Sequence, residues 1–455
     1  MKEWIFQRLY LFYSSVLLLY LINYFLENPT LNYTIGLLAI PMMGVSFLWA
    51  SRLFKILCSV FIISGLVMYI SVGLPIHEIP LFLTSNMSML AFLTVLPWIN
   101  GVVHVGHYDR HINGLMKKEV DNLGSLYVRS TLTTYVLMTF LNLSAINLSQ
   151  SVLIENMKKT QKAVRDALIS KTTIRAFALA LIWSPMEIIV AITVDATGIS
   201  YLVYLPWLLL ISAIALGIDL FLGRQQYKKI PYTDETGDES GLPFRGVIQQ
   251  ILKLFFALIL FLTTILVVSN LFELNFILTV TLVILPFSII WSLLIKKWTE
   301  FRVLGYRLWK EQTNRMQNFT LLFISLAFFA NSLNATPILG LVQQPFLAFD
   351  DKPFIILFLI FATYFVLATI GVHPIGTIGI LLEVLTPLFA IINPVSIGIV
   401  LIVAALATSS SATYGITITM TSMNTNQNPY RITLRNLSFT FLLGFIGIGI
   451  GLLIL

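Results

Sequence analysis

The chain alternates between long apolar segments and short polar ones, a pattern that predicts a series of membrane-spanning helices. One helical crossing of a bilayer core needs about 20 apolar residues, and most of the apolar segments have this length. The predicted spans are residues 5–26, 32–50, 54–73, 80–103, 176–198, 203–222, 248–269, 275–295, 317–340, 395–423 and 436–455. The expected fold is an all-α polytopic membrane protein with about ten to eleven transmembrane helices.

The apolar segment at residues 131–154 has positive charge on both sides. Arg129 precedes it, and Lys158, Lys159 and Lys162 follow it. Loops rich in Lys and Arg stay on the cytoplasmic side, so both ends of the segment should lie there. The segment is too short for two crossings of about 20 residues each. We therefore predict a re-entrant hairpin, which is tolerated only where its tip is buried in protein or lines a watery cavity.

A second hairpin is predicted at residues 353–390. With the N-terminus in the cytoplasm, the positive loops all fall inside only if this region starts and ends outside. Its middle, GVHPIGTIG, has no Lys or Arg. A hairpin that enters from outside starts and ends on that side, and so do two full spans joined by a tight inner turn. The hairpin is our prediction, with the two-span arrangement as its alternative.

The polar stretch at residues 223–245 divides the chain into two similar halves. It contains the acidic patch TDETGDESG and is expected to be a cytoplasmic linker. The halves, 1–222 and 246–455, each contain a hairpin followed by a helix with polar or helix-breaking residues. Opposite hairpins in two inverted repeats are typical of secondary transporters, whose sites form from broken helices near the membrane midplane.

Composition agrees with a membrane protein and excludes several other classes. Of the 455 residues 57% are hydrophobic and 11% are charged, against about 25% charged in soluble domains. The net charge of +7 lies in short loops beside spans, so the topology rule explains it without a nucleic acid partner. The single cysteine, Cys58, excludes an intrachain disulfide and a cysteine metal site. His104, His107 and His111 share a helical face, but a solvated interfacial face is expected there, with no metal and no cofactor.

The tip of the first hairpin carries the first group of candidate binding residues. Asn142, Ser144 and Asn147 lie in the sequence LNLSAINLSQ, within an otherwise apolar segment. Amide and hydroxyl groups are costly in hydrocarbon without partners. They are expected to coordinate a cation through oxygen or to donate to an anion. The alternative is that they join neighbouring helices by hydrogen bonds.

The following span is predicted to be broken at Pro185, which removes one helical hydrogen bond and clashes with the preceding turn. Ser184 is placed to bond a freed backbone carbonyl. Glu187 follows, well inside the span, and a carboxylate there is a functional candidate by default. It is expected to relay a proton, bind a cation or pair with a Lys or Arg.

The second hairpin carries His373, Gly376 and Thr377 at its predicted turn. Histidine titrates near neutral pH, so His373 is a candidate for proton coupling, with a neutral histidine bonded to a carbonyl as the alternative. Glu383 follows in apolar surroundings, which favour a protonated or paired state.

Hydroxyl side chains crowd the predicted span at residues 395–423. They lie around Gly415, a combination that weakens a helix and favours an unwound stretch with exposed backbone groups. A Ser/Thr-rich packing interface is the alternative. The candidate binding residues in this stretch are Ser409, Ser410, Ser411 and Thr413.

The order of these features resembles the ion transporter superfamily, in particular its divalent-anion:sodium symporter branch. TFLNLSAINLS (139–149) is similar to that branch's first hairpin, with Asn142 to Ser144 on its Ser-Asn-Thr triplet. IWSPMEIIVA (182–191) is similar to its first broken helix and ALATSSSATYG (405–415) to its second, while GVHPIGT stands where the second triplet would be. The resemblance implies uptake of carboxylates or inorganic anions coupled to sodium, an elevator-like motion and a homodimer.

Together these observations predict a secondary active transporter in the cytoplasmic membrane rather than an enzyme. It would move a small, anionic solute, coupled to Na⁺ or H⁺. The alternatives are an exporter or flippase of a lipid-linked or polymeric envelope intermediate, and a membrane enzyme acting on such a lipid, because the hairpin architecture does not name its cargo.

Overall fold

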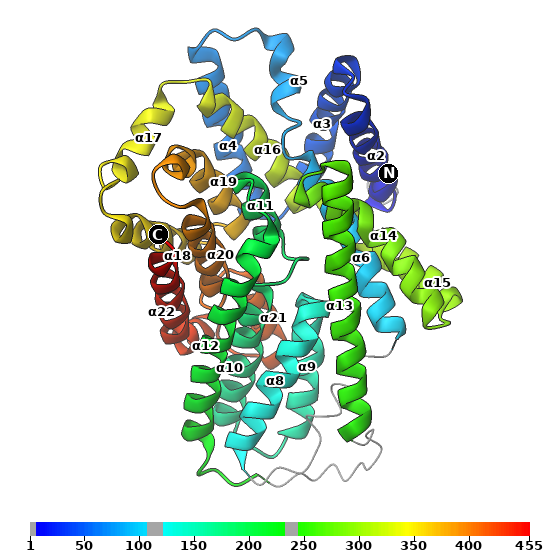
Figure 1. Cartoon of the computed structure of the whole chain (residues 1–455), viewed down its shortest axis with the longest axis vertical. Helices are drawn as coiled ribbons and strands as arrows, with labels where there is room; N and C mark the ends of the chain where they lie inside the picture. Colours follow the sequence, from blue (N-terminus) through cyan, green and yellow to red (C-terminus); the bar gives the residue numbers. More distant parts are fainter. Residues whose placement is uncertain (1–5, 107–121, 233–243) are drawn as a thin grey trace. The chain divides into compact units, whose positions relative to one another are not determined.

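The computed structural model describes residues 6–106, 122–232 and 244–455, and its regular elements there are helices (Figure 1). His107, His111 and the acidic patch at 233–241 lie outside the described residues. The all-α prediction is confirmed. The helices fall into two compact units, each built from separate stretches of the chain.

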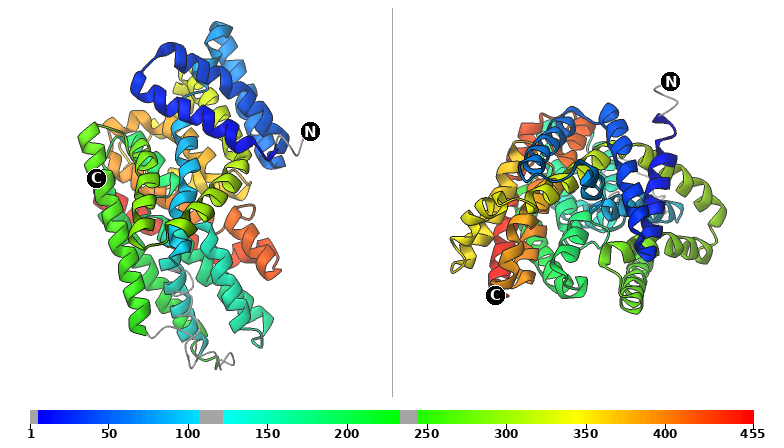
Figure 2. Two further views of the ribbon diagram at one scale, coloured as in Figure 1. Left: turned by 90° about the vertical axis from the view of Figure 1, so that its right-hand side faces the viewer. Right: turned by 90° about the horizontal axis from the view of Figure 1, so that it is seen from above.

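The first unit comprises residues 1–105, 267–349 and 378–388. Its helices are α2 (Leu9–Leu26), α3 (Pro29–Trp49), α4 (Arg52–Ser71), η1 (Ile76–Glu78), α5 (Ile79–Phe82), α6 (Met87–Val105), α14 (Phe276–Leu294), α15 (Trp298–Asn314), α16 (Gln317–Asn334) and α17 (Ile338–Leu347). Helix α16 packs against α3, α4 and α6, and α2 lies beside α3 (Figure 2).

The second unit comprises residues 106–266, 350–377 and 389–455. Its helices are α8 (Leu123–Leu141), α9 (Leu143–Asn156), α10 (Lys162–Leu181), α11 (Ile188–Thr197), α12 (Tyr201–Tyr227), α18 (Pro353–Thr369), α20 (Pro394–Ser409), α21 (Ile416–Thr425) and α22 (Pro429–Leu453). The chain passes between the units within α13 (Phe244–Phe272) and α19 (Pro374–Leu385), and η3 (Thr386–Ala390) follows α19.

Asn-Pro pairs mark the starts of three helices. The side chains of Asn28, Asn393 and Asn428 each accept a hydrogen bond from a backbone N–H in the first turn of the helix that follows. Proline fits the first helical position because its missing N–H would have no partner there. The sequence therefore sets the beginnings of α3, α20 and α22 locally.

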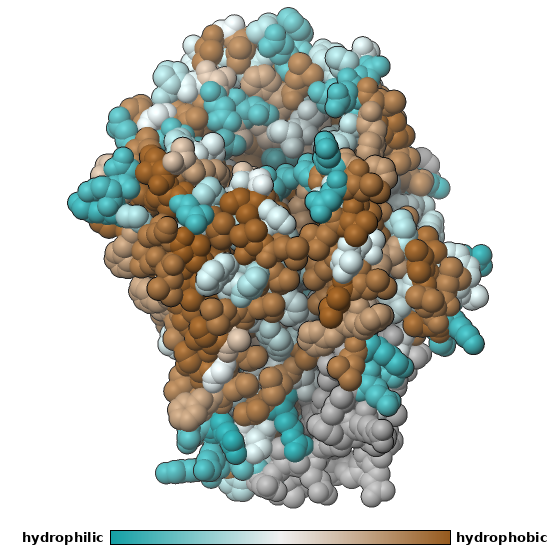
Figure 3. All heavy atoms as spheres, viewed as in Figure 1, coloured by the Kyte–Doolittle hydropathy of each residue, from teal (hydrophilic) through white to brown (hydrophobic). Residues whose placement is uncertain are grey.

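Eight helices in the described part of the chain are long and apolar enough to cross a membrane, and nine if the bent pair α15–α16 forms one span. The predicted ten to eleven spans include 176–198 and 395–423, which are divided into shorter helices at the predicted breaks and so do not count among these long helices. Apolar side chains cover the face that carries α12 and α22, where Phe221 is 63% and Phe445 49% exposed (Figure 3). Such a continuous apolar surface indicates contact with lipid, so this is a multi-pass membrane protein.

Two positively charged stretches between the predicted apolar segments, where cytoplasmic loops are expected, are helical. Residues 296–316 contain α15, whose Phe301 is fully buried and whose ring lies 5.8 Å from that of Trp98, centroid to centroid. Residues 157–175 contain the start of α10, and Arg175 is buried in it. Charge counting missed both because an amphipathic helix can carry many charges on its polar face.

Candidate functional site

The first predicted hairpin is a pair of helices, α8 and α9, joined at the single residue Asn142. The pair starts earlier than the predicted 131–154, because Asn122 caps α8 by accepting a hydrogen bond from Ser125 N at 3.0 Å. Asn142 has φ 47° and ψ −132°. Positive φ is uncommon outside glycine, and asparagine is among the few residues that tolerate it. The turn therefore falls inside the predicted polar cluster, and whether the pair is re-entrant stays a prediction.

The predicted break at Pro185 separates α10 from α11. In the gap Ser184 N donates to Leu181 O at 3.2 Å, and Ser184 Oγ accepts from Met186 N at 3.3 Å. The freed carbonyl of Trp183 accepts a hydrogen bond from the hydroxyl of Tyr201. Side chains thus satisfy two of the backbone groups at the break, and Ser184 bonds an N–H rather than the carbonyl expected of it.

Asn142 and Glu187 meet at this break. Asn142 Nδ2 lies 3.4 Å from Glu187 Oε2 and donates to it. Glu187 is only 9% exposed and precedes α11, where the first N–H groups of a helix have no intrahelical partner. Among the described residues, no Lys or Arg forms an ion pair with it. The hairpin tip therefore contacts a buried carboxylate whose charge no basic side chain in the described chain balances.

The hairpin is also tied to the second broken helix through Gln150. Its amide Nε2 donates to Thr173 Oγ1 at 2.9 Å and to Thr421 Oγ1 at 2.8 Å. Asn424 Nδ2 donates to Gln150 Oε1 at 2.9 Å and to Asn147 Oδ1 at 2.7 Å. Asn147 thus bonds α21, as the packing alternative expected, whereas Ser144 is exposed.

The break between α20 and α21 is held by hydroxyl groups. Ser409 Oγ donates to Leu406 O at 2.6 Å, and Thr417 Oγ1 donates to the freed Ser409 O at 2.7 Å. Two further contacts join the break to α22: Ser410 Oγ lies 2.8 Å from Thr440 Oγ1, and Thr413 Oγ1 lies 3.0 Å from Thr433 Oγ1. Ser411 is 3% exposed. The predicted unwound stretch is present, and its hydroxyls stabilise it.

The predicted second turn lies between α18 and α19, at Gly371, which has φ 94°. His373 caps α19, since its Nδ1 accepts a hydrogen bond from Ile375 N at 3.3 Å. Gly376 and Thr377 form the first turn of α19 and are buried, and Thr377 Oγ1 has no hydrogen-bond partner among the described residues. Buried polar atoms normally have a partner, so Thr377 is the residue of this turn best suited to a ligand.

All twelve candidate binding residues belong to the second compact unit, while Glu383 belongs to the first. There, Asn334 Nδ2 donates to Glu383 Oε2 at 2.8 Å, and Gln343 Nε2 donates to Glu383 O at 3.0 Å. The Glu383 carboxylate is therefore paired, as predicted, and its partner is the amide of Asn334 in the same unit.

A buried ion pair between Arg175 and Asp219 was not predicted. Arg175 Nη1 lies 2.6 Å from Asp219 Oδ1, and Tyr127 donates to Asp219 Oδ2 at 2.8 Å. Arg175 also donates to Asn436 Oδ1 and to Arg435 O, each at 3.0 Å. The network joins α8, α10, α12 and α22. The sequence signal for this ion pair was Asp219, which lies within the predicted span 203–222, because a charge at that depth needs a partner.

No group of three or more His, Cys, Asp and Glu side chains in the described ranges is placed to hold a metal ion. His104 is half-buried at the end of α6, while His107 and His111 lie beyond the described residues.

Comparison with known proteins gives a fold likeness. No protein-family model and no curated protein matches the chain. The solved structure of the YdaH transporter of Alcanivorax borkumensis is similar to it, with a TM-score of 0.59 and 13% identity over 88% of this chain and 97% of that one. The chain therefore shares the fold of a membrane transporter.

Proposed function

We propose that this protein is a secondary active transporter that moves a small anionic solute across the cytoplasmic membrane, coupled to Na⁺ or H⁺. The observation that carries the proposal is the contact between Asn142 at the tip of the first hairpin and Glu187 at the helix break. The fold likeness to a transporter supports it.

Glu187 is the proposed coupling residue. A buried carboxylate without an ion-pair partner is costly, and binding a proton or a sodium ion removes that cost. Neutralising the carboxylate also weakens its attraction for the Asn142 amide, since hydrogen bonds to a charged acceptor are the stronger ones. Ion binding at Glu187 would thereby change how the hairpin tip is held. If this alters the affinity for the solute, solute binding alters the affinity for the ion by the same factor.

The solute is proposed to bind at the two broken helices. Half-helix N-termini present unpaired N–H groups and the positive end of the helix dipole, which favour an anion. Helices α11 and α21 each begin directly after a break, at Ile188 and Ile416. Ser184 and the partnerless hydroxyl of Thr377 are the side-chain donors that we assign to the solute.

The test is uptake by purified protein in proteoliposomes, with dicarboxylates, sulfate and phosphate as solutes and with sodium and proton gradients imposed separately. Accumulation driven by one of the gradients is expected. Glu187→Gln keeps the side chain's shape but can neither take up a proton nor balance a cation, so it should abolish accumulation.

Glu311→Gln is the matched control, because Glu311 is exposed on α15. The control should accumulate solute like the native protein. Accumulation by Glu187→Gln at the native level would remove Glu187 from coupling. Turnover of a lipid-linked substrate without any gradient would favour the enzyme alternative.

A further inference from the structure

A cationic cavity lies where the α9–α10 turn meets the α21–α22 turn. Neither helix break contributes a residue to its lining. Its volume is about 410 Å³. Residues 161–166 form one wall and residues 426–435 the other. By the positive-inside rule both segments belong to the predicted cytoplasmic face. This volume falls in the range of about 300–1,000 Å³ that is usual for small-molecule sites.

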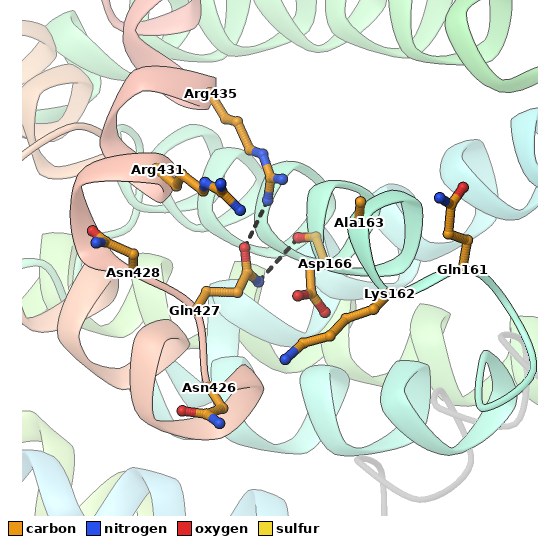
Figure 4. Close-up of a pocket in the computed structure, with 9 residues that line it drawn as sticks. All are labelled: Gln161, Lys162, Ala163, Asp166, Asn426, Gln427, Asn428, Arg431 and Arg435. Atoms are coloured by element: carbon orange, nitrogen blue, oxygen red, sulfur yellow. Dashed lines mark hydrogen bonds between the residues drawn. The ribbon is translucent and has the colours of Figure 1, made fainter.

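The charges of the cavity are mostly positive. Lys162, Arg431 and Arg435 line it together with one carboxylate, Asp166 (Figure 4). Asp166 is itself paired, because Arg165 Nη2 lies 3.3 Å from its Oδ1. In Figure 4 the Arg431 and Arg435 head groups come together on one side of the Gln427 amide, and the Lys162 ammonium lies on its other side. The field inside the cavity therefore favours an anion.

The cavity walls are held in place by hydrogen bonds. Gln427 is 9% exposed, and its Nε2 donates to Asp166 O at 3.1 Å and to Thr425 Oγ1 at 2.8 Å. Its Oε1 accepts from Arg435 Nη1 at 2.7 Å. The backbone of Arg435 is fixed as well, since its carbonyl accepts from the buried Arg175. Both N–H donors and the oxygen of the Gln427 amide thus have partners, and these bonds fix the cavity walls before any ligand binds.

Two of the three cations have no partner among the described residues. In the described part of the chain, no hydrogen bond or ion pair engages the side chain of Lys162 or of Arg431, whereas Arg435 bonds Gln427. A planar guanidinium matches phosphate oxygens in a bidentate arrangement, and an ammonium adds a point charge. Basic pockets beside membrane helices on the cytoplasmic side are suited to phosphate-bearing head groups.

We propose that this cavity binds a phosphate-bearing anion, held by Lys162, Arg431 and Arg435. The phosphate belongs either to a small soluble ester or to the head group of an anionic lipid. Bound there, it ties the α9–α10 turn to the start of α22. This site is separate from the proposed transport site and does not depend on it.

The experiment measures binding to the full-length protein in two arms. In the first, labelled inorganic phosphate and glycerol 3-phosphate are titrated against delipidated protein in neutral detergent. In the second, phosphatidylglycerol or phosphatidylcholine is added, and retained lipid is counted by native mass spectrometry. Lys162→Gln with Arg431→Gln removes two charges. Arg302→Gln with Arg307→Gln, both on exposed positions of α15, is the control of equal charge.

The cavity variant should weaken binding of a soluble phosphate, of phosphatidylglycerol, or of both by at least about tenfold, because hydrogen bonds to charged groups are involved. The control should bind like the native protein. Loss confined to the first arm identifies a soluble ester, and loss confined to the second identifies a lipid head group. Failure of every phosphate probe to bind, or equal weakening in the control, would overturn the proposal. Both variants change exposed side chains that have no partner in the part of the chain that the structure describes, so unaltered elution and thermal unfolding are expected of each.

Discussion

The buried Arg175–Asp219 pair allows a stability prediction that follows from individual contacts. Asp219 is 1% exposed and Arg175 is 8% exposed. Asp219→Asn keeps the shape of the side chain and its acceptor for Tyr127, but it removes the negative charge that balances Arg175. Removing one partner of a buried pair leaves an uncompensated charge and costs about 3–5 kcal/mol. The expected result is a loss of this size in the free energy of unfolding.

The assay is reversible unfolding in mixed detergent, followed by the circular dichroism of the helices. The control is Asp350→Asn, since Asp350 is exposed and its replacement should leave stability unchanged. The double variant Arg175→Gln with Asp219→Asn removes both charges. It should lose less stability than the sum of the two single variants, because neither buried charge is left alone.

The same small effect of Asp219→Asn and Asp350→Asn would show that Asp219 does not balance a buried charge. Strict additivity in the double variant would likewise contradict a direct pair. Tyr127→Phe supplies an internal check, because it removes one hydrogen bond to the charged Asp219. Its expected cost is about 1.5–3 kcal/mol, which is below the cost of Asp219→Asn.

Three further predictions concern the hairpins. Gln150→Leu removes the hydrogen bonds to Thr173, Thr421 and Asn424 and should cost about 1–3 kcal/mol in the same assay; an unchanged stability would show that the amide does not tie α9 to α21. Gly371→Ala places a side chain at φ 94° and should destabilise the protein by about 1–2 kcal/mol. Its control is Gly217→Ala in α12, where open space surrounds the added methyl group, and it should not destabilise the protein. Equal effects of the two substitutions would contradict the turn at Gly371. Asn142→Gly removes the donor to Glu187 but tolerates the positive φ of 47°, so it should lower gradient-driven uptake at least about tenfold with little loss of folded protein. Native uptake would deny the contact a role.

The sequence predicted the local features of the site well. Asn142 was expected at a turn because polar groups crowd an apolar segment there, and Glu187 was expected beside a break because Pro185 cannot continue a helix. Both signals depend on nearest neighbours along the chain. The contact between the two residues, 45 positions apart, is a product of packing that no local pattern contains.

The features that were missed depend on partners distant in the sequence. Arg175 was placed in a cytoplasmic loop because it follows several lysines, yet Asp219 and Asn436 make its burial tolerable. The cavity around Gln427 needs α10 and α22 side by side, which charge counting does not predict. At His373 the sequence suggested a chemical role, proton coupling, and the structure shows a local structural contact, because its Nδ1 accepts the hydrogen bond that caps α19.

In the proposed transporter α8 and α9 enter the membrane together and leave on the same side, carrying Asn142 to Glu187. Cys58 is the only cysteine and is fully buried, so single cysteines introduced at Arg129 and Lys158, both exposed, can be labelled without replacing it. A membrane-impermeant maleimide applied to oriented vesicles should reach both positions from the cytoplasmic side alone. Labelling of the two positions from opposite sides of the membrane would contradict the account.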